Sequence, residues 1–124
     1  MSKTIRLFLA FEAAAFLIAS LVHSDYLIHG YAHPRARIAE GVIAVVLLAG
    51  LVCSLVRPGW TRRAGLAAQG FALLGTLVGA FTIAIGVGPR TVPDVIYHIT
   101  ILIVLAWGLV VTARARPDAG ARGG

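Results

Sequence analysis

Carboxylate and imidazole side chains stand inside or at the edge of long apolar runs in this sequence, and these are the groups that could do chemistry. They are Glu12, Glu40, Asp94 and His98. An ionisable group in the hydrocarbon of a bilayer costs at least about 2.5 kcal/mol, so each one needs a partner or a function. Imidazole changes charge near neutral pH, and together with carboxylates it can bind a proton, a metal ion or a small polar ligand.

Glu12 is the deepest of these groups. At 1.5 Å per residue it lies about 10 Å into its apolar run, and no Lys or Arg stands at that depth on any run. We expect Glu12 to be protonated or hydrogen-bonded to Gln69, which lies at a similar depth on another run. The helical face through Glu12 also carries Ser20 and His23 at i+8 and i+11. The polar residues of this face either form a structural hydrogen bond or contact a proton or ligand.

Glu40 and His98 lie at similar depths near the opposite boundary, since His98 is about 9 Å inside its run. They would touch if their helices were neighbours, and we predict a polar site there, joined by His23 or Asp94. Arg37, one turn before Glu40, allows a surface ion pair instead. His98 is as readily interpreted as a neutral histidine of the core as a residue that binds a ligand. Asp94 also fits a helix cap.

A segment rich in histidine lies between the first two apolar runs. Asp25, His29 and His33 follow one another at i, i+4 and i+8. Carboxylate and imidazole on one face could hold Zn²⁺ or another divalent metal. Gly30 and Pro34 interrupt any helix there, so the alternative is an interfacial loop of aromatic and histidine residues.

Several known chemistries have no motif in this chain. There is no P-loop, no G-x-G-x-x-G, no C-x-x-C and no C-x-x-C-H for covalent haem. Cys53 is the one cysteine, so a redox thiol pair is excluded. The net charge of +6 comes from Lys and Arg residues placed between the apolar runs. That distribution argues against nucleic-acid binding, which needs a clustered basic surface.

Composition places these residues in a membrane protein. Of 124 residues, 59% are hydrophobic and 13% are charged, whereas an average soluble domain has about 25% charged residues. Four apolar runs approach the roughly 20 residues needed to cross a bilayer. They cover 4–23, 38–56, 65–86 and 92–113. We predict an all-α integral membrane domain over 1–113, a bundle of four transmembrane helices, and a polar flexible C-terminal tail over 114–124.

The positions of the basic residues predict the orientation of the bundle. Eight of the 11 Lys and Arg residues flank the first run, the middle connection and the end of the last run. Because positive loops stay on the cytoplasmic side, we expect both termini in the cytoplasm and two in–out–in hairpins. In gross pattern the chain resembles small four-span bacterial membrane proteins, which favours the bacterial inner membrane.

Small residues at helical spacing predict where helices pack closely. The third run carries Gly75 and Gly79 four residues apart, and the first carries Ala15 and Ala19. Such pairs let backbones approach inside lipid. They lie either at contacts between helices of one bundle or at the interface of a homodimer or larger oligomer.

We expect the lipid bilayer to surround this protein. The sequence is compatible with three functions. The first is a small membrane protein that binds or translocates a proton, metal ion or small polar ligand at the Glu/His site. The second is a redox protein with b-type haem or a quinone, for which His23 and His98 are candidate ligands. The third is a structural or accessory subunit whose polar residues only join helices. The sequence indicates no enzyme activity.

Overall fold

The computed structural model describes residues 1–117 as four long α-helices and one short 3₁₀ helix. The helices are α1 (Ser2–His23), α2 (Pro34–Val56), α3 (Thr61–Ala84) and α4 (Val92–Arg114), with the 3₁₀ helix η1 at Pro58–Trp60. No strand occurs within these 117 residues, so the predicted all-α class is confirmed. Of the C-terminal tail predicted over 114–124, residues 118–124 lie outside the described residues.

Three helices begin earlier than their apolar runs, and the first of them, α1, begins at Ser2. The helix α2 begins at Pro34 and α3 at Thr61, whereas the apolar runs begin at 38 and 65. Among the helices with such early starts, α2 has a side-chain cap, whereas α1 and α3 have none. At α2 the cap is His33, whose Nδ1 accepts a hydrogen bond from the Ala36 N–H at 3.1 Å. At α4 the helix cap expected at Asp94 is confirmed, because Thr91 and Asp94 form a capping box.

All four helices are long and apolar enough to cross a membrane. Their outward faces are covered with large apolar side chains; Phe11, Leu74, Ile103 and Trp107 are each at least 60% exposed. An apolar surface of this extent is far larger than the patches that water-exposed monomers tolerate. The chain therefore has the make-up of a small multi-pass membrane protein.

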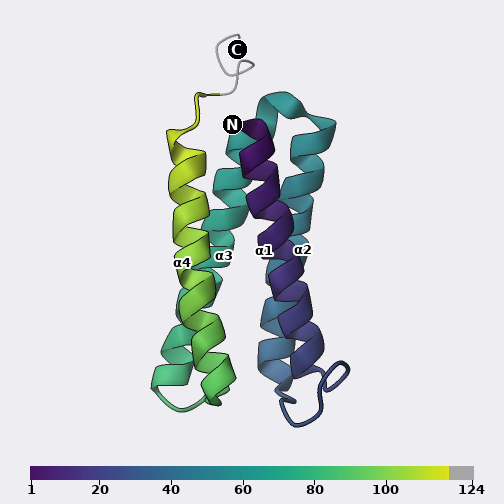
Figure 1. The fold of residues 1–124 in the computed structure, drawn as a ribbon, viewed down its shortest axis with the longest axis vertical. Helices are drawn as coiled ribbons and strands as arrows, with labels where there is room; N and C mark the ends of the chain where they lie inside the picture. Colours follow the sequence, from purple (N-terminus) through teal and green to yellow (C-terminus); the bar gives the residue numbers. More distant parts are fainter. Residues whose placement is uncertain (118–124) are drawn as a thin grey trace.

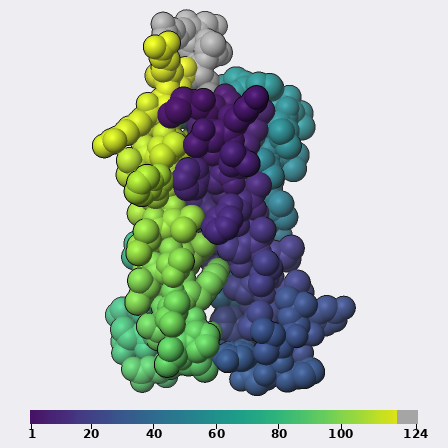
Figure 2. Space-filling model, viewed as in Figure 1, coloured from purple at the N-terminus to yellow at the C-terminus, as the bar shows by residue number. Residues whose placement is uncertain are grey.

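The four helices lie lengthwise in one bundle, and consecutive helices run in opposite directions (Figure 1). The start of α1 and the end of α4 share one end of the bundle. The opposite end, called here the loop end, carries the connections 24–33 and 85–91. Each helix packs on the next along the chain, and α1 also contacts both α3 and α4. Figure 2 shows α1 beside α4 on the near face.

One face of α1 lies in the middle of the bundle because α1 contacts all three other helices. Glu12, Phe16, Ala19 and His23 are buried along it. They include most of the helical face predicted through Glu12. Glu12 and His23 are therefore held inside protein rather than against lipid, whereas Ser20 on the same face is half-buried.

Glycines set two of the helix–helix distances. A Cβ built on Gly75 would lie 2.9 Å from Ile43 Cδ1 of α2, and one on Gly79 would lie 3.3 Å from His98 Nε2 of α4. Ala19 is 8% exposed, and Ala15 packs against the core. These four residues lie at contacts within the bundle, the first of the two alternatives predicted for them.

Candidate functional site

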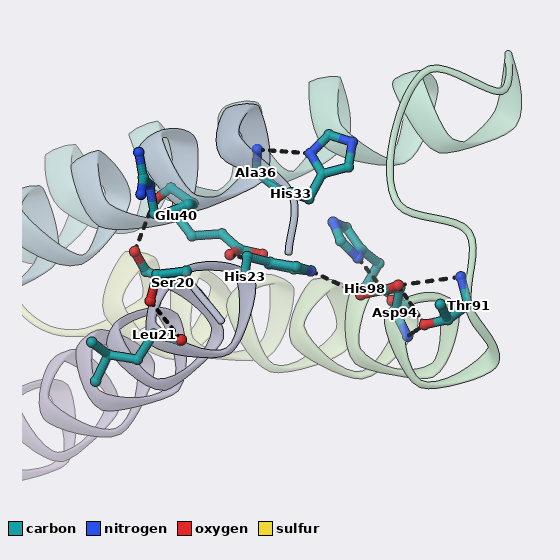
Figure 3. Close-up of polar contacts among 11 residues, drawn as sticks. Ser20, Leu21, His23, His33, Ala36, Glu40, Thr91, Asp94 and His98 are labelled. Atoms are coloured by element: carbon teal, nitrogen blue, oxygen red, sulfur yellow. Dashed lines mark hydrogen bonds and ion pairs between the residues drawn. The ribbon is translucent and has the colours of Figure 1, made fainter. Parts of the chain in front are cut away.

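His23, at the last residue of α1, lies between two carboxylates of other helices (Figure 3). Its Nδ1 is 2.6 Å from Glu40 Oε2 of α2, and its Nε2 is 2.9 Å from Asp94 Oδ1 of α4. The three residues are 4%, 5% and 7% exposed. We call them the His23 cluster. It joins three helices at the loop end of the bundle.

The hydrogen bonds of this cluster determine how many protons it holds. A neutral imidazole has one N–H donor and one acceptor nitrogen, and an ionised carboxylate only accepts. Two contacts to carboxylates therefore require one further proton, either on the imidazole ring or on a carboxyl group. In both arrangements the net charge of the cluster is negative by one unit. Within residues 1–117 the ion pairs of Glu40 and Asp94 are with His23.

Asp94 is bound on its other side by the start of its own helix. Its Oδ2 accepts a hydrogen bond from the Thr91 N–H at 3.2 Å and one from the Thr91 hydroxyl. The N-terminal end of a helix also favours a negative charge. The ionised form of Asp94 satisfies all of these contacts.

Glu40 has one oxygen that His23 does not occupy. This Oε1 is buried and has no hydrogen-bond partner among the described residues. Glu40 also lines a partly enclosed cavity of about 190 Å³ at the loop end. Other walls of the cavity come from Ile43, Thr76, Gly79, Thr82 and His98. Glu40 therefore combines a buried oxygen without a partner with a place on the cavity wall, and it is the residue of this site that a ligand could contact.

His98 lies on the cavity but does not bind Glu40. Its Nδ1 is 2.8 Å from the Asp94 carbonyl one turn earlier on α4, and its Nε2 faces Gly79. The structure therefore replaces the expected Glu40–His98 contact with Glu40–His23. It adds Asp94 as the third member, which the sequence offered only as an alternative.

A second polar group lies further along the bundle, toward the ends of the chain. Gln69 Nε2 donates to Glu12 Oε1 and Oε2 at 3.1 and 3.2 Å, and Thr112 Oγ1 donates to Gln69 Oε1 at 2.7 Å. All three side chains are 0% exposed. The hydrogen bond expected between Glu12 and Gln69 is thus present, and Thr112 orients the amide.

The histidine-rich loop does not gather its three predicted ligands. His29 Nδ1 is 3.2 Å from Asp25 Oδ2, but His33 caps α2. No group of three or more His, Cys, Asp or Glu residues in the described part of the chain is placed to hold a metal ion. Asp25 instead organises the loop, because its Oδ1 accepts from the Gly30 N–H at 2.9 Å.

These contacts predict an unusual titration of Asp25. The hydrogen bond from His29, and then that from the Gly30 N–H, lowers the pKa of Asp25 below its ordinary value of 3.8. A lowered pKa means that the loop contact is fully present above pH 3.8 and is lost as the pH falls through the lower value. Carboxyl ¹³C NMR should place the midpoint below 3.8, and His29→Ala should move it upward. A wild-type midpoint at or above the ordinary value would contradict the contact.

The histidines do not fit the alternative of a b-type haem. Axial ligation needs an imidazole nitrogen with a free lone pair on each side of the iron. Both ring nitrogens of His23 are taken by carboxylates, and His98 uses Nδ1 on a carbonyl. Their remaining nitrogen, Nε2 of His98, faces Gly79 of α3. The pair proposed from the sequence is therefore not placed to bind haem.

Sequence reasoning missed several residues around the cavity. They include Thr76, Thr82 and Arg35. Sequence reasoning also missed Tyr97, whose buried hydroxyl has no hydrogen-bond partner among the described residues. A signal existed for Thr82, because it continues the face of Gly75 and Gly79 at i+7. Nothing in the sequence shows that this face borders a cavity.

Comparison with protein-family models, curated proteins and solved structures found no match to this chain. Its function must therefore be inferred from the His23 cluster and the cavity beside it.

Proposed function

We propose that this chain is a multi-pass membrane protein that takes up a proton at the His23 cluster and couples it to a small polar ligand. The observation that carries the proposal is His23 held between two buried carboxylates of two other helices. A net negative charge in a low-dielectric surrounding strongly attracts a proton. Uptake of a second proton would neutralise the cluster.

The position of the cluster gives it a route to water. Glu40 borders the cavity, whose wall at the loop end includes the exposed Arg35 and the half-buried His33. A proton can therefore reach Glu40 without crossing the apolar middle of the bundle. With both termini cytoplasmic, as the Lys and Arg distribution favours, the loop end would face the outside of a bacterial inner membrane.

A structural role is the rival that the same contacts allow. In that case the carboxylates and His23 only join helices, each hydrogen bond contributing about 1–2 kcal/mol at most. The position of Glu40 favours the binding role, because this residue both has a buried oxygen without a partner and lines the cavity. The exposed face of α4 around Trp107 would meet lipid or a second copy in either case.

Proton uptake by protein in lipid nanodiscs tests the proposal. Potentiometric titration of the wild-type chain should show an uptake step whose midpoint and size change in His23→Gln, because the two carboxylates then titrate without the imidazole. The step should persist unchanged in His29→Gln, since His29 lies in the exposed loop outside the cluster. Identical titration curves for wild type and His23→Gln would show that the cluster does not exchange protons, and would leave the structural role.

A further inference from the structure

We propose that the cavity beside Glu40 binds a small primary ammonium cation, a protonated amine of few heavy atoms. This inference deepens the proposed function, since Glu40 serves both the proton site and the ligand. It stands on two separate observations, the cavity of about 190 Å³ and the buried Glu40 Oε1 without a partner.

Two threonines on the cavity wall offer acceptors, while His33 and Arg35 at its loop end carry donors. The Thr76 hydroxyl donates its hydrogen to the Ala72 carbonyl at 2.7 Å, and the Thr82 hydroxyl donates to the Gly79 carbonyl at 2.7 Å. Each threonine oxygen therefore offers only lone pairs to a ligand.

His98 and Glu40 add to the same pattern. His98 Nδ1 donates to the Asp94 carbonyl, which leaves a lone pair on Nε2 of the neutral ring. The Glu40 carboxylate accepts, and its Oε1 is the unused oxygen. These acceptors of α2, α3 and α4 match a ligand that carries N–H donors.

The charge of the cluster and the size of the cavity further restrict the chemical class of the ligand. The His23 cluster carries a net negative charge, and a cation in the cavity would neutralise it at short range. The apolar walls of Phe16, Ile43 and Val78 suit a short alkyl group. A volume of about 190 Å³ is below the roughly 300–1,000 Å³ of pockets for drug-sized ligands.

A divalent metal fits this wall less well than an ammonium group. No set of three or more His, Cys, Asp or Glu residues within 1–117 is arranged to hold a metal ion. An ammonium group replaces part of its lost hydration with N–H hydrogen bonds to Glu40 and Thr82. Thr76 lies about 9 Å further along α3 and is too far to bind the same nitrogen. Arg35 lies on the cavity wall but is exposed, so its charge is screened by water.

The test is equilibrium binding of radiolabelled methylammonium to the full chain in nanodiscs at fixed pH. Wild type should bind saturably, and Glu40→Gln should weaken binding by at least about tenfold, since it removes the negative charge. Thr82→Val removes one acceptor without changing side-chain volume greatly, and should weaken binding severalfold. Thr100→Val is the matched control, because Thr100 is an exposed helical threonine that donates to its own helix at Ile96.

Competing ions separate the possible results. Unlabelled ethylammonium should displace the label, whereas tetramethylammonium, which has no N–H donor, should not. Equal displacement by both ions, absence of saturable binding, or unchanged binding in Glu40→Gln and Thr82→Val would each overturn the ammonium site. Circular dichroism of each variant distinguishes lost binding from lost folding, and Thr82→Val gives the result if Glu40→Gln fails to fold.

Proton uptake measured on the same samples distinguishes failure of this inference from failure of the proposed function. Uptake that depends on His23, without methylammonium binding, would remove the ammonium site alone. Methylammonium binding without such uptake would remove the proton site and leave the cavity as a binding site.

Discussion

Replacement of His23 by Leu is expected to lower the free energy of unfolding by about 3–5 kcal/mol, the usual loss when one partner of a buried ion pair is removed. His23 contacts Glu40 Oε2 at 2.6 Å and Asp94 Oδ1 at 2.9 Å. Without the imidazole, two buried carboxylates would face an apolar side chain. One of them would have to take up a proton or turn toward the cavity.

Unfolding in mixed detergent, followed by circular dichroism, measures this loss. His29→Leu is the control, since the side chain of His29 is 88% exposed and the change should stay within about 0.5 kcal/mol. Adding Glu40→Gln to His23→Leu should recover part of the stability because it removes one unpaired charge. A loss below about 1 kcal/mol in His23→Leu would show that water or a proton already neutralises the carboxylates.

The depth of Glu12 and Gln69 along their helices was enough to predict their hydrogen bond. Two polar groups at one level of a narrow bundle have few other partners, so rise per residue gives the pairing. The contact between α1 and α3 then brings the two side chains together. The capping box at Thr91 was predictable for a similar reason, because it is local in sequence.

The partner of Glu40 was not predictable in the same way. Glu40, His98 and His23 lie at similar levels, and depth alone does not select between the two histidines. The selection depends on which helix lies between the others, and α1 contacts α2, α3 and α4. His98 also has a nearby alternative, the Asp94 carbonyl one turn before it. Rotation of each helix about its axis therefore decides the site, and one sequence does not fix that rotation.

The cavity was beyond prediction for a related reason. Its wall combines small residues of α3 with side chains of α2 and α4. The spacing of Gly75 and Gly79 predicts close packing, and both residues do lie against neighbouring helices. The same small residues also leave room beside Glu40. Whether a glycine brings two helices into contact or leaves a cavity between them depends on the side chains of the facing helix.

Gly108→Ala is expected to destabilise the bundle by about 2–5 kcal/mol, the sum of overpacking and a disturbed buried hydrogen bond. A Cβ on Gly108 would lie 2.5 Å from Gln69 Nε2, 2.6 Å from Glu12 Oε1 and 2.8 Å from Phe8 Cδ1. The first two atoms belong to the hydrogen-bonded group of Glu12, Gln69 and Thr112, which has no exposed side to move into.

Gly70→Ala gives the matched control for this substitution. Gly70 lies within α3, and a Cβ there would meet nothing within 4 Å. Since Ala favours a helix over Gly, this variant should be stabilised by about 0.5–1 kcal/mol. Adding Glu12→Ala to Gly108→Ala should open space for the new methyl group, so the two losses should fall short of additivity by more than about 0.5 kcal/mol. If Gly108→Ala unfolds like Gly70→Ala, the Glu12 group is not packed against α4, and the close contact at Gly108 is wrong.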